Sequence, residues 1–362
     1  MYKEYSESLT RMVTRDESTS LKSDKLTVPF LPKDHSIYID KMTTIYGRSM
    51  SGKSFLIKEI IKILSPYIPN IFVFGDENIA DSYSSFVPEN AICHDLTVEG
   101  FKAILSRQEQ VALLYKTGHN EKKLMKMFDT VASADEKQTL AKINYKFDKE
   151  IANIKRLRCE YAKKAGKINK LTKLKEKAQC EYYRKILLRH KNDGRLGSHE
   201  KAVINYFNMN PRTLIIMDDC AQILDPIKKD MSLIKAAFQG RHSFITSVFA
   251  MQNITYMPAP LRQNSMLLLF TTNDAVTGFF NNSAAGQKHN SKVAQQYANA
   301  IFGACESHHK KMAFIPQQNQ FYYTLANVYP PFEFGSRSFR RLMDNLPDQR
   351  IKISSKYTKT RV

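Results

Sequence analysis

The chain has 362 residues, and its apolar fraction of 43% is typical of a globular protein with a sizeable core. Its 55 lysines and arginines against 35 acids give a formal charge of +20, which favours an anionic partner and most commonly nucleic acid. The 5 cysteines lack zinc-site spacing, no apolar run is long enough for a membrane span, and the N-terminus lacks a signal-peptide pattern. We therefore expect an intracellular protein that is not integral to a membrane.

A phosphate-binding loop stands near the start of the chain. Residues 1–40 are polar and weakly periodic, and we expect an extended arm there. The run 42–46 then predicts a strand, and 55–61 predicts a helix. Between them residues 47–54 read G-R-S-M-S-G-K-S, which fits G-x-x-x-x-G-K-[ST]. Such a loop turns backbone N–H groups toward a polyphosphate, and the helix N-terminus adds positive charge, so this pattern predicts a nucleoside-triphosphate site.

The positions of this loop have distinct expected roles at ATP and Mg²⁺. Lys53 would reach the β- and γ-phosphates, and the Ser54 hydroxyl would hold the Mg²⁺. The residues expected to line the nucleotide are Gly47, Arg48, Ser49, Met50, Ser51, Gly52, Lys53, Ser54 and Phe55. The alternative, a plain Gly/Ser-rich surface loop, does not account for the flanking strand and helix.

A long basic segment follows the second predicted strand, at 69–75. Residues 121–192 contain 21 lysines and arginines against 9 acids, with apolar residues at helical spacing. We expect a basic helical insertion at 119–204, formed by two amphipathic helices with a bend at Gly166. It could bind along a nucleic-acid backbone or contact a partner, or it could be a coiled coil with a solvated lysine face. The sequence leaves these alternatives open.

The second half of the site is an acid pair at the end of an apolar run. Asp218 would hold the Mg²⁺ through water, and Asp219 would orient and polarise the attacking water. An Asp-Asp helix cap is the alternative. Further apolar runs and helical segments follow at 227–238, 244–251, 265–270, 291–303, 311–315 and 320–325. Their alternation predicts an α/β fold with a mostly parallel sheet covered by helices on both faces.

Three more residues are candidates for catalysis. Gln252 follows a predicted core strand, where it could contact the γ-phosphate or the lytic water, although such a residue can also be a simple turn residue. Arg241 and Arg262 are candidates for a finger that neutralises charge on a neighbouring subunit's γ-phosphate. Either arginine could instead lie on the surface or contact DNA.

The order of these motifs resembles the FtsK–HerA superfamily of DNA-translocating ATPases, and within it the genome-packaging ATPases of large nucleocytoplasmic DNA viruses. The motifs are G-R-S-M-S-G-K-S, I-I-M-D-D, G-R-H before a β-run, Met251-Gln252 and L-R-Q-N. The resemblance implies a RecA-like P-loop ATPase core, here at 41–118 and 205–335, followed by a basic tail at 336–362. The basic insertion is longer than a minimal core needs, so the resemblance assigns it no role.

The resemblance also implies a function. We expect an Mg²⁺-dependent ATPase that moves double-stranded DNA without reading its sequence, as a hexameric ring with ATP sites between subunits. It would package a viral genome in the host cytoplasm, with a capsid or internal-membrane protein as a candidate docking partner. The alternatives are a P-loop kinase of a nucleotide or other small substrate, and a nucleotide-gated assembly protein. No [NT]-K-x-D motif for guanine and no D-E-x-[DH] helicase motif is present.

Overall fold

The structure is a computed structural model that describes residues 20–23, 26–76, 79–94, 97–157, 161–220, 240–282, 290–303 and 309–345. The chain divides into two compact units. The core unit comprises residues 1–108 and 212–362, and the helical unit comprises residues 109–211. The helix predicted at 227–238 lies outside the described residues. In the described part of the chain, no helix is long and apolar enough to cross a membrane.

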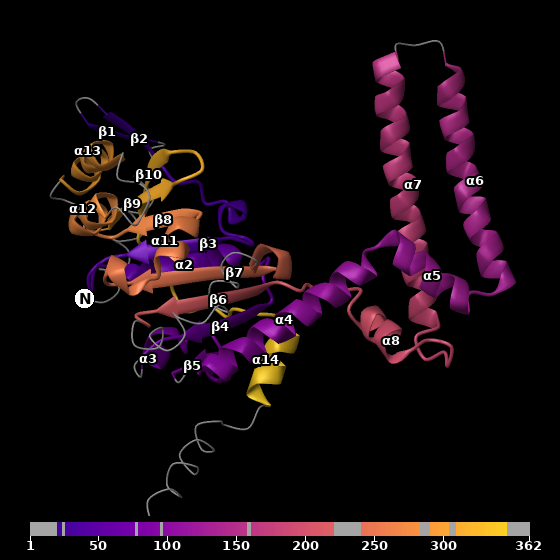
Figure 1. The fold of residues 1–362 in the computed structure, drawn as a ribbon, viewed down its shortest axis with the longest axis horizontal. Coiled ribbons are helices and arrows are strands. Elements are labelled where there is room, and N and C mark those ends of the chain that lie inside the picture. The colour runs from indigo at the N-terminus through magenta and orange to yellow at the C-terminus, as the bar shows by residue number, and fades with distance from the viewer. Residues whose placement is uncertain are drawn as a thin grey trace, which may run out of the picture. The chain divides into compact units, whose positions relative to one another are not determined.

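An eight-stranded sheet forms the centre of the core unit (Figure 1), with the strand order β10-β9-β8-β3-β7-β6-β4-β5. The strands are β3 (Met42–Tyr46), β4 (Asn70–Phe74), β5 (Ile92–Cys93), β6 (Thr213–Asp218), β7 (Ile245–Met251), β8 (Leu267–Phe270), β9 (Lys310–Ile315) and β10 (Gln320–Leu325). All neighbours from β8 to β5 pair in parallel, whereas β9 and β10 add an antiparallel hairpin at one edge. The predicted α/β class, with a mostly parallel sheet flanked by helices, is confirmed.

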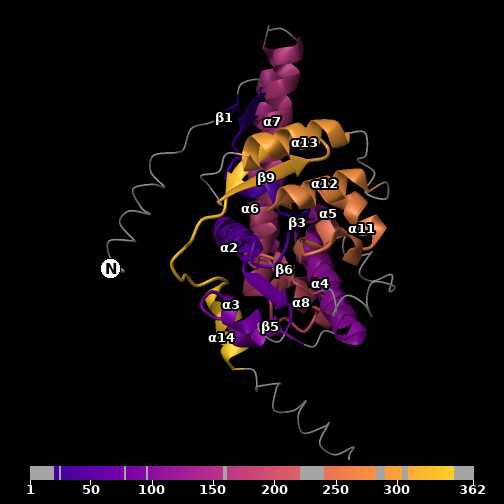
Figure 2. The ribbon, with the colours of Figure 1, turned by 90° about the vertical axis from the view of Figure 1, so that its left-hand side faces the viewer.

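Helices cover both faces of this sheet, as Figures 1 and 2 show. One face carries the first half of α4 (Val98–Gly118), with α11 (Ala259–Asn264), α12 (Asn273–Asn281) and α13 (Ser291–Phe302). The other carries α2 (Lys53–Leu64), α3 (Ile79–Tyr83) and α14 (Arg337–Asp344). Every residue of β7 is buried: Phe249 belongs to one apolar cluster, and Val248 and Ala250 belong to the other. Alternating side chains of a central parallel strand serve two cores in this way.

Segments expected to lie outside the core are partly built into it. Strand β2 (Leu26–Pro29) pairs with β1 (Ser20–Ser23), and the Leu31 N–H donates to the Tyr323 carbonyl at 2.8 Å. Leu31 and Tyr38 are buried, so residues 26–40 differ from the expected extended arm. In the expected tail, α14 buries Phe339 and Met343. A few apolar anchors in a polar stretch produce no clear periodicity, which explains the difference.

The helical unit has a separate apolar core. Its helices are the second half of α4, with α5 (Glu121–Val131), α6 (Ala134–Arg156), α7 (Tyr161–Arg189) and α8 (Ser198–Asn205). The buried residues are Leu124, Met127, Phe128, Val131, Tyr183, Ile186, Leu187, Leu196, Val203, Ile204 and Phe207. They come from α5, the end of α7, α8 and the adjoining loops, whereas α6 has no buried residue. This core therefore supports only one end of the α6–α7 pair.

The predicted bend at Gly166 is wrong. Gly166 lies inside α7, which already begins at Tyr161, whereas α6 ends at Arg156. An exposed glycine costs a helix only about 1 kcal/mol, so the good helix formers around it carry the helix through. The short 3-10 helices are η1 (His35–Ile37), η2 (Glu89–Ala91), η3 (Gly240–Ser243) and η4 (Ile254–Tyr256).

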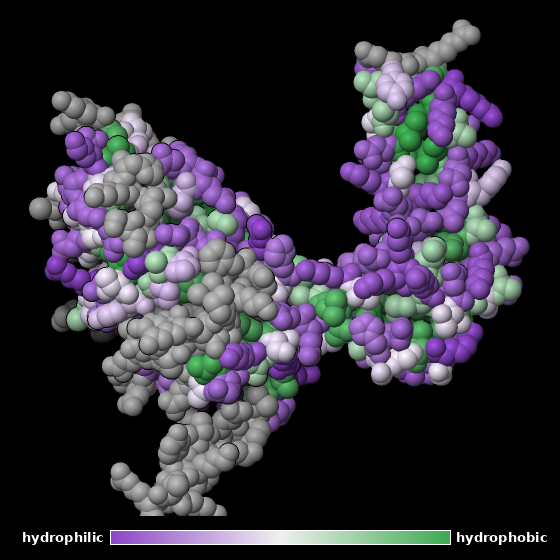
Figure 3. Space-filling model, viewed as in Figure 1, coloured by the Kyte–Doolittle hydropathy of each residue, from purple (hydrophilic) through white to green (hydrophobic). Residues whose placement is uncertain are grey.

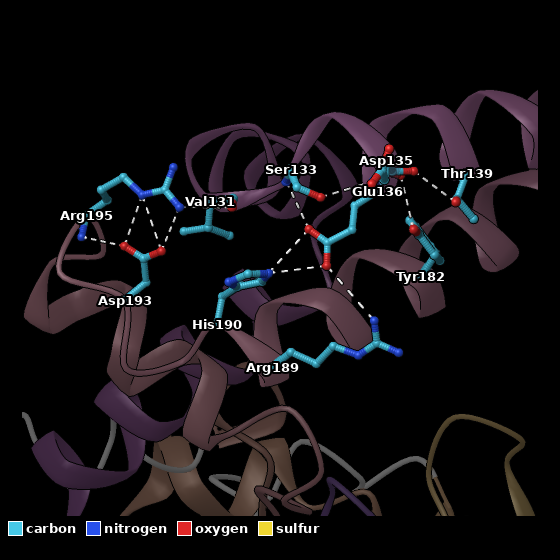
Figure 4. Close-up of polar contacts among 10 residues, drawn as sticks. All are labelled: Val131, Ser133, Asp135, Glu136, Thr139, Tyr182, Arg189, His190, Asp193 and Arg195. Carbon is cyan, nitrogen blue, oxygen red and sulfur yellow. Dashed lines mark hydrogen bonds and ion pairs between the residues drawn. The ribbon is translucent and has the colours of Figure 1, made fainter.

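A polar cluster fixes the start of α6 against the end of α7 (Figure 4). The Ser133 N–H donates to Glu136 Oε2 at 2.9 Å, while the Ser133 hydroxyl accepts from the Glu136 N–H, which completes a capping box. His190, directly after α7, has Nε2 3.2 Å from Glu136 Oε1, and the hydroxyl of Tyr182 in α7 donates to the Glu136 carbonyl at 3.0 Å. The bond from Ser133 and the nearby His190 hold the pKa of Glu136 below its ordinary value.

Candidate nucleotide-binding site

The loop at 47–54 lies at the carboxyl edge of the sheet. The Gly47 N–H donates to the Met251 carbonyl at 3.1 Å, so the loop begins beside the end of β7. A Cβ added to Gly47 would lie 1.6 Å from Thr271 Oγ1, and no side chain fits there. Gly52 has a φ of 94°, in the left-handed region, immediately before the first turn of α2. A side chain at position 47 would clash with Thr271, and the φ at position 52 favours glycine, so the structure calls for glycine at both positions.

Lys53 is held between the loop and the acid pair. Its side chain is 4% exposed, and Nζ lies 3.1 Å from the Arg48 carbonyl and 3.4 Å from Asp219 Oδ1. Asp219 turns the chain at the end of β6 with a φ of 48°, and its N–H donates to the Ala250 carbonyl at 3.1 Å. The structure thus brings together the lysine of the loop and the second acid, which are far apart in the sequence.

Asp218, the last residue of β6, is buried beneath the loop. The Tyr83 hydroxyl donates to Asp218 Oδ2 at 2.7 Å, and the Ser54 hydroxyl lies 3.3 Å from the same oxygen. Burial raises the pKa of Asp218, and the charge of Asp219 adds to this, while the hydrogen bond from Tyr83 opposes it. Sequence reasoning missed Tyr83, because a single tyrosine after a strand carries no motif signal.

The oxygens at this point fit a Mg²⁺ ion. Asp218 Oδ1 is buried and forms no hydrogen bond with any described residue, so one carboxylate oxygen is left for a further partner. Ser54 and Asp218 supply a hydroxyl and a carboxylate, and Mg²⁺ typically combines one or two such ligands with waters and nucleotide phosphates. Within the described ranges, no group of three or more His, Cys, Asp or Glu could hold a metal alone. The donor set therefore suits a metal bound together with a nucleotide.

Gln252 reaches the same edge through the sheet register. In the parallel pairing of β3 with β7, Tyr46 stands opposite Met251, so Gly47 and Gln252 each follow directly at the strand ends. Gln252 is exposed, and its side chain forms no hydrogen bond with a described residue. It stands where a group could contact a phosphate or a water bound at the loop.

The two candidate finger arginines have different surroundings. Arg262 in α11 is 9% exposed and donates from Nη1 to the Ile254 carbonyl at 2.9 Å. This hydrogen bond joins α11 to η4, and Arg262 would have to break it to contact a phosphate elsewhere. Arg241 in η3 is exposed and precedes β7, so it lies at the opposite edge of the sheet from the loop of its own chain. Arg241 therefore lies away from the loop of its own chain.

Several supporting residues of the loop were not singled out from the sequence. Thr271, directly after β8, donates its N–H to the Tyr46 carbonyl at 2.9 Å and places Oγ1 2.5 Å from Ser51 Oγ. Lys311 of β9 is buried behind the loop, with Nζ 3.4 Å from the Thr271 carbonyl, and burial lowers its pKa. In the exposed half of the loop, Arg48 forms an ion pair with Asp274. These contacts join strands that are distant in sequence, so local patterns contain no signal for them.

Fold and site together have the arrangement of a phosphate-binding loop at the carboxyl edge of a mostly parallel α/β sheet. No protein-family model matches the chain. The protein is 28% identical over 323 residues to the uncharacterized protein B354L of African swine fever virus, isolate Pig/Kenya/KEN-50/1950, with 84% of this chain and 87% of that protein covered. A second isolate, Warthog/Namibia/Wart80/1980, gives the same values.

Solved structures show a weaker likeness. The genome packaging NTPase B204 of Sulfolobus turreted icosahedral virus 2, in complex with ATP-gammaS, has a TM-score of 0.35 and 11% identity, covering 83% of this chain and 100% of its own. The plasmid coupling protein TrwB in complex with ADP and Mg²⁺ has a TM-score of 0.35 and 10% identity, covering 92% and 94%.

Proposed function

We propose that this protein is an ATP-hydrolysing motor that translocates double-stranded DNA and packages a viral genome into a capsid, as a ring with ATP sites between subunits. The observation that carries the hydrolytic part is the contact of Lys53 with Asp219 beside the Ser54–Asp218 pair. The net charge of +20 and the motif order support DNA as the substrate that is moved.

The residues at the loop would divide the work of hydrolysis. Backbone N–H groups at the start of α2 and the Lys53 ammonium bind the β- and γ-phosphates. Ser54 and Asp218 would hold a Mg²⁺, which supplies positive charge at the phosphates. Asp219 orients a water and accepts its proton as the water oxygen bonds to the γ-phosphorus and the bond to the bridging oxygen breaks. Gln252 contacts the γ-phosphate or this water from the end of β7.

The contact between Lys53 and Asp219 supports a switch on nucleotide binding. The two side chains lie 3.4 Å apart and partly neutralise each other. A γ-phosphate competes for the Lys53 ammonium, because a phosphate carries more charge than a carboxylate and accepts more hydrogen bonds. Asp219, which is 30% exposed, is then released to bind water. The general base would thereby become available only when the substrate is present.

DNA handling is tested by the ATPase rate with and without linear duplex DNA across a salt series. We expect duplexes of unrelated sequence to stimulate the ATPase rate. This stimulation should weaken steeply as the salt concentration rises, because binding to backbone phosphates releases counterions. Lys53→Ala should abolish turnover through lost phosphate binding. The absence of stimulation at every salt concentration, with intact basal turnover, would refute translocation and favour the nucleotide-gated assembly protein.

A further inference from the structure

The α6–α7 hairpin, defined as residues 140–178, is the least enclosed part of the helical unit. The fully buried residues of this core include Tyr183, Ile186 and Leu187 from α7 and none from α6, of which Leu140 packs against the core half-buried. Along the hairpin itself, half-buried apolar residues such as Ile143, Phe147 and Leu171 form the seam between the helices. Figure 3 shows this apolar seam between hydrophilic surfaces. The outward face of each helix is left to solvent.

Positive charge is concentrated on these outward faces. The described ranges 142–157 and 161–177 contain 12 lysines and arginines against 3 acids. On α7, Lys163, Lys167, Lys170, Lys173 and Lys177 recur every three or four residues and are exposed. On α6, Lys142, Lys146 and Lys149 follow the same spacing, Arg156 lies two turns further on, and all four are exposed. Each set therefore forms one continuous stripe on the side of its helix away from the seam.

Ion pairs between described residues neutralise part of this charge. Asp148 pairs with Lys175 at 2.7 Å, near the seam, where Gln179 also donates to Asn144 at 2.9 Å. Lys177 lies 3.9 Å from Glu181 at the end of its stripe. Cations three and four residues apart repel each other and destabilise a free helix, whereas a merely solvated face usually mixes both signs. The stripes fit a surface that is neutralised by a polyanion.

We propose that the lysine stripes of α6 and α7 bind the phosphate backbone of duplex DNA, as a contact separate from the nucleotide site. At 1.5 Å per residue, the stripe from Lys163 to Lys177 spans about 21 Å, or roughly six base pairs. Lysine side chains carry a compact charge on a flexible chain, so they bind phosphates and do not distinguish between bases. The stripes have no row of aromatic residues for stacking single-stranded bases. The apolar seam is used in helix packing, so it is not available to enter a membrane.

The test compares charge-neutralised variants of the full chain. The α7 variant carries Lys167→Gln, Lys170→Gln and Lys173→Gln, and the α6 variant carries the same change at Lys142, Lys146 and Lys149. The matched control carries Lys122→Gln, Lys126→Gln and Lys185→Gln, which are exposed lysines of the helical unit outside both stripes. Glutamine keeps the helix propensity, and circular dichroism with thermal melting checks that each variant is folded.

Binding to a 30-base-pair duplex is measured by fluorescence anisotropy without nucleotide, across a salt series. We expect each stripe variant to lose roughly tenfold or more in affinity, and the salt slope to fall by about one per lost phosphate contact, while the control changes less than about twofold. Stripe variants that match the control would overturn the proposal. Competition by poly-glutamate as effective as that by unlabelled duplex would also overturn it, in favour of an acidic protein partner. DNA binding is measured here without hydrolysis, so the test of the lysine stripes remains valid even if the protein proves not to hydrolyse ATP.

Discussion

Replacing Asp219 by asparagine separates the two roles that the structure gives this acid. Asparagine retains the shape of the side chain and tolerates the left-handed φ of 48°, so the turn after β6 should persist. The substitution removes the negative charge 3.4 Å from Lys53 Nζ. The lysine then no longer has to leave a carboxylate when it binds a phosphate.

The magnitude follows from the exposure of the pair. Coulomb's law at 3.4 Å gives about 5 kcal/mol at an effective dielectric constant of 20, before the cost of desolvation. Because Asp219 is 30% exposed, a net value of about 1 kcal/mol is appropriate, as for partly solvated ion pairs. We therefore expect ATP to bind roughly fivefold more tightly to Asp219→Asn. Loss of the general base should lower kcat by about 10²–10⁴-fold.

The assay combines equilibrium titration with a fluorescent ATP analogue and single-turnover hydrolysis. Asp274→Asn is the matched control, because it breaks the exposed ion pair with Arg48 on the other side of the loop. We expect this control to change neither quantity by more than about twofold. Normal hydrolysis by Asp219→Asn would refute its role as the base, and a tenfold loss of ATP affinity would refute the competition for Lys53.

Two further changes test backbone and pH. Gly52→Ala places a side chain at a φ of 94°, with the new Cβ 3.3 Å from Lys311 Cε. This change should lower the free energy of unfolding by about 1–2 kcal/mol. Gly166 in α7 has open space where a Cβ would lie, so Gly166→Ala should instead raise the free energy of unfolding by up to about 1 kcal/mol. Glu136→Gln should lower the Tm of the helical unit at pH 7. Because folding depresses the pKa of Glu136, its stabilisation is present above the unfolded pKa and is lost as pH falls through the folded pKa. The Tm difference should therefore vanish in acid, and a difference that persists there would contradict the role of its charge.

The sequence by itself determined the local part of the site. The strand, loop and helix around residues 47–54 were predictable because the phosphate-binding motif is continuous in the chain and its glycines are fixed by backbone geometry. Strands β6 and β7 were recognisable because a strand buried on both faces is apolar throughout. The acid pair at the end of β6 followed from the same pattern.

Only the tertiary structure decided which of these pieces meet. Insertion of β7 between β3 and β6 places Gln252 beside Gly47, and the pairing order of a sheet is not contained in any one strand. The hydrogen bond from Tyr83 to Asp218 likewise joins residues that are 135 positions apart. The continuation of α7 through Gly166 was not predictable from glycine propensity alone, because an exposed glycine costs a helix only about 1 kcal/mol. Local patterns determine elements, whereas contacts between distant elements depend on the packing of the whole chain.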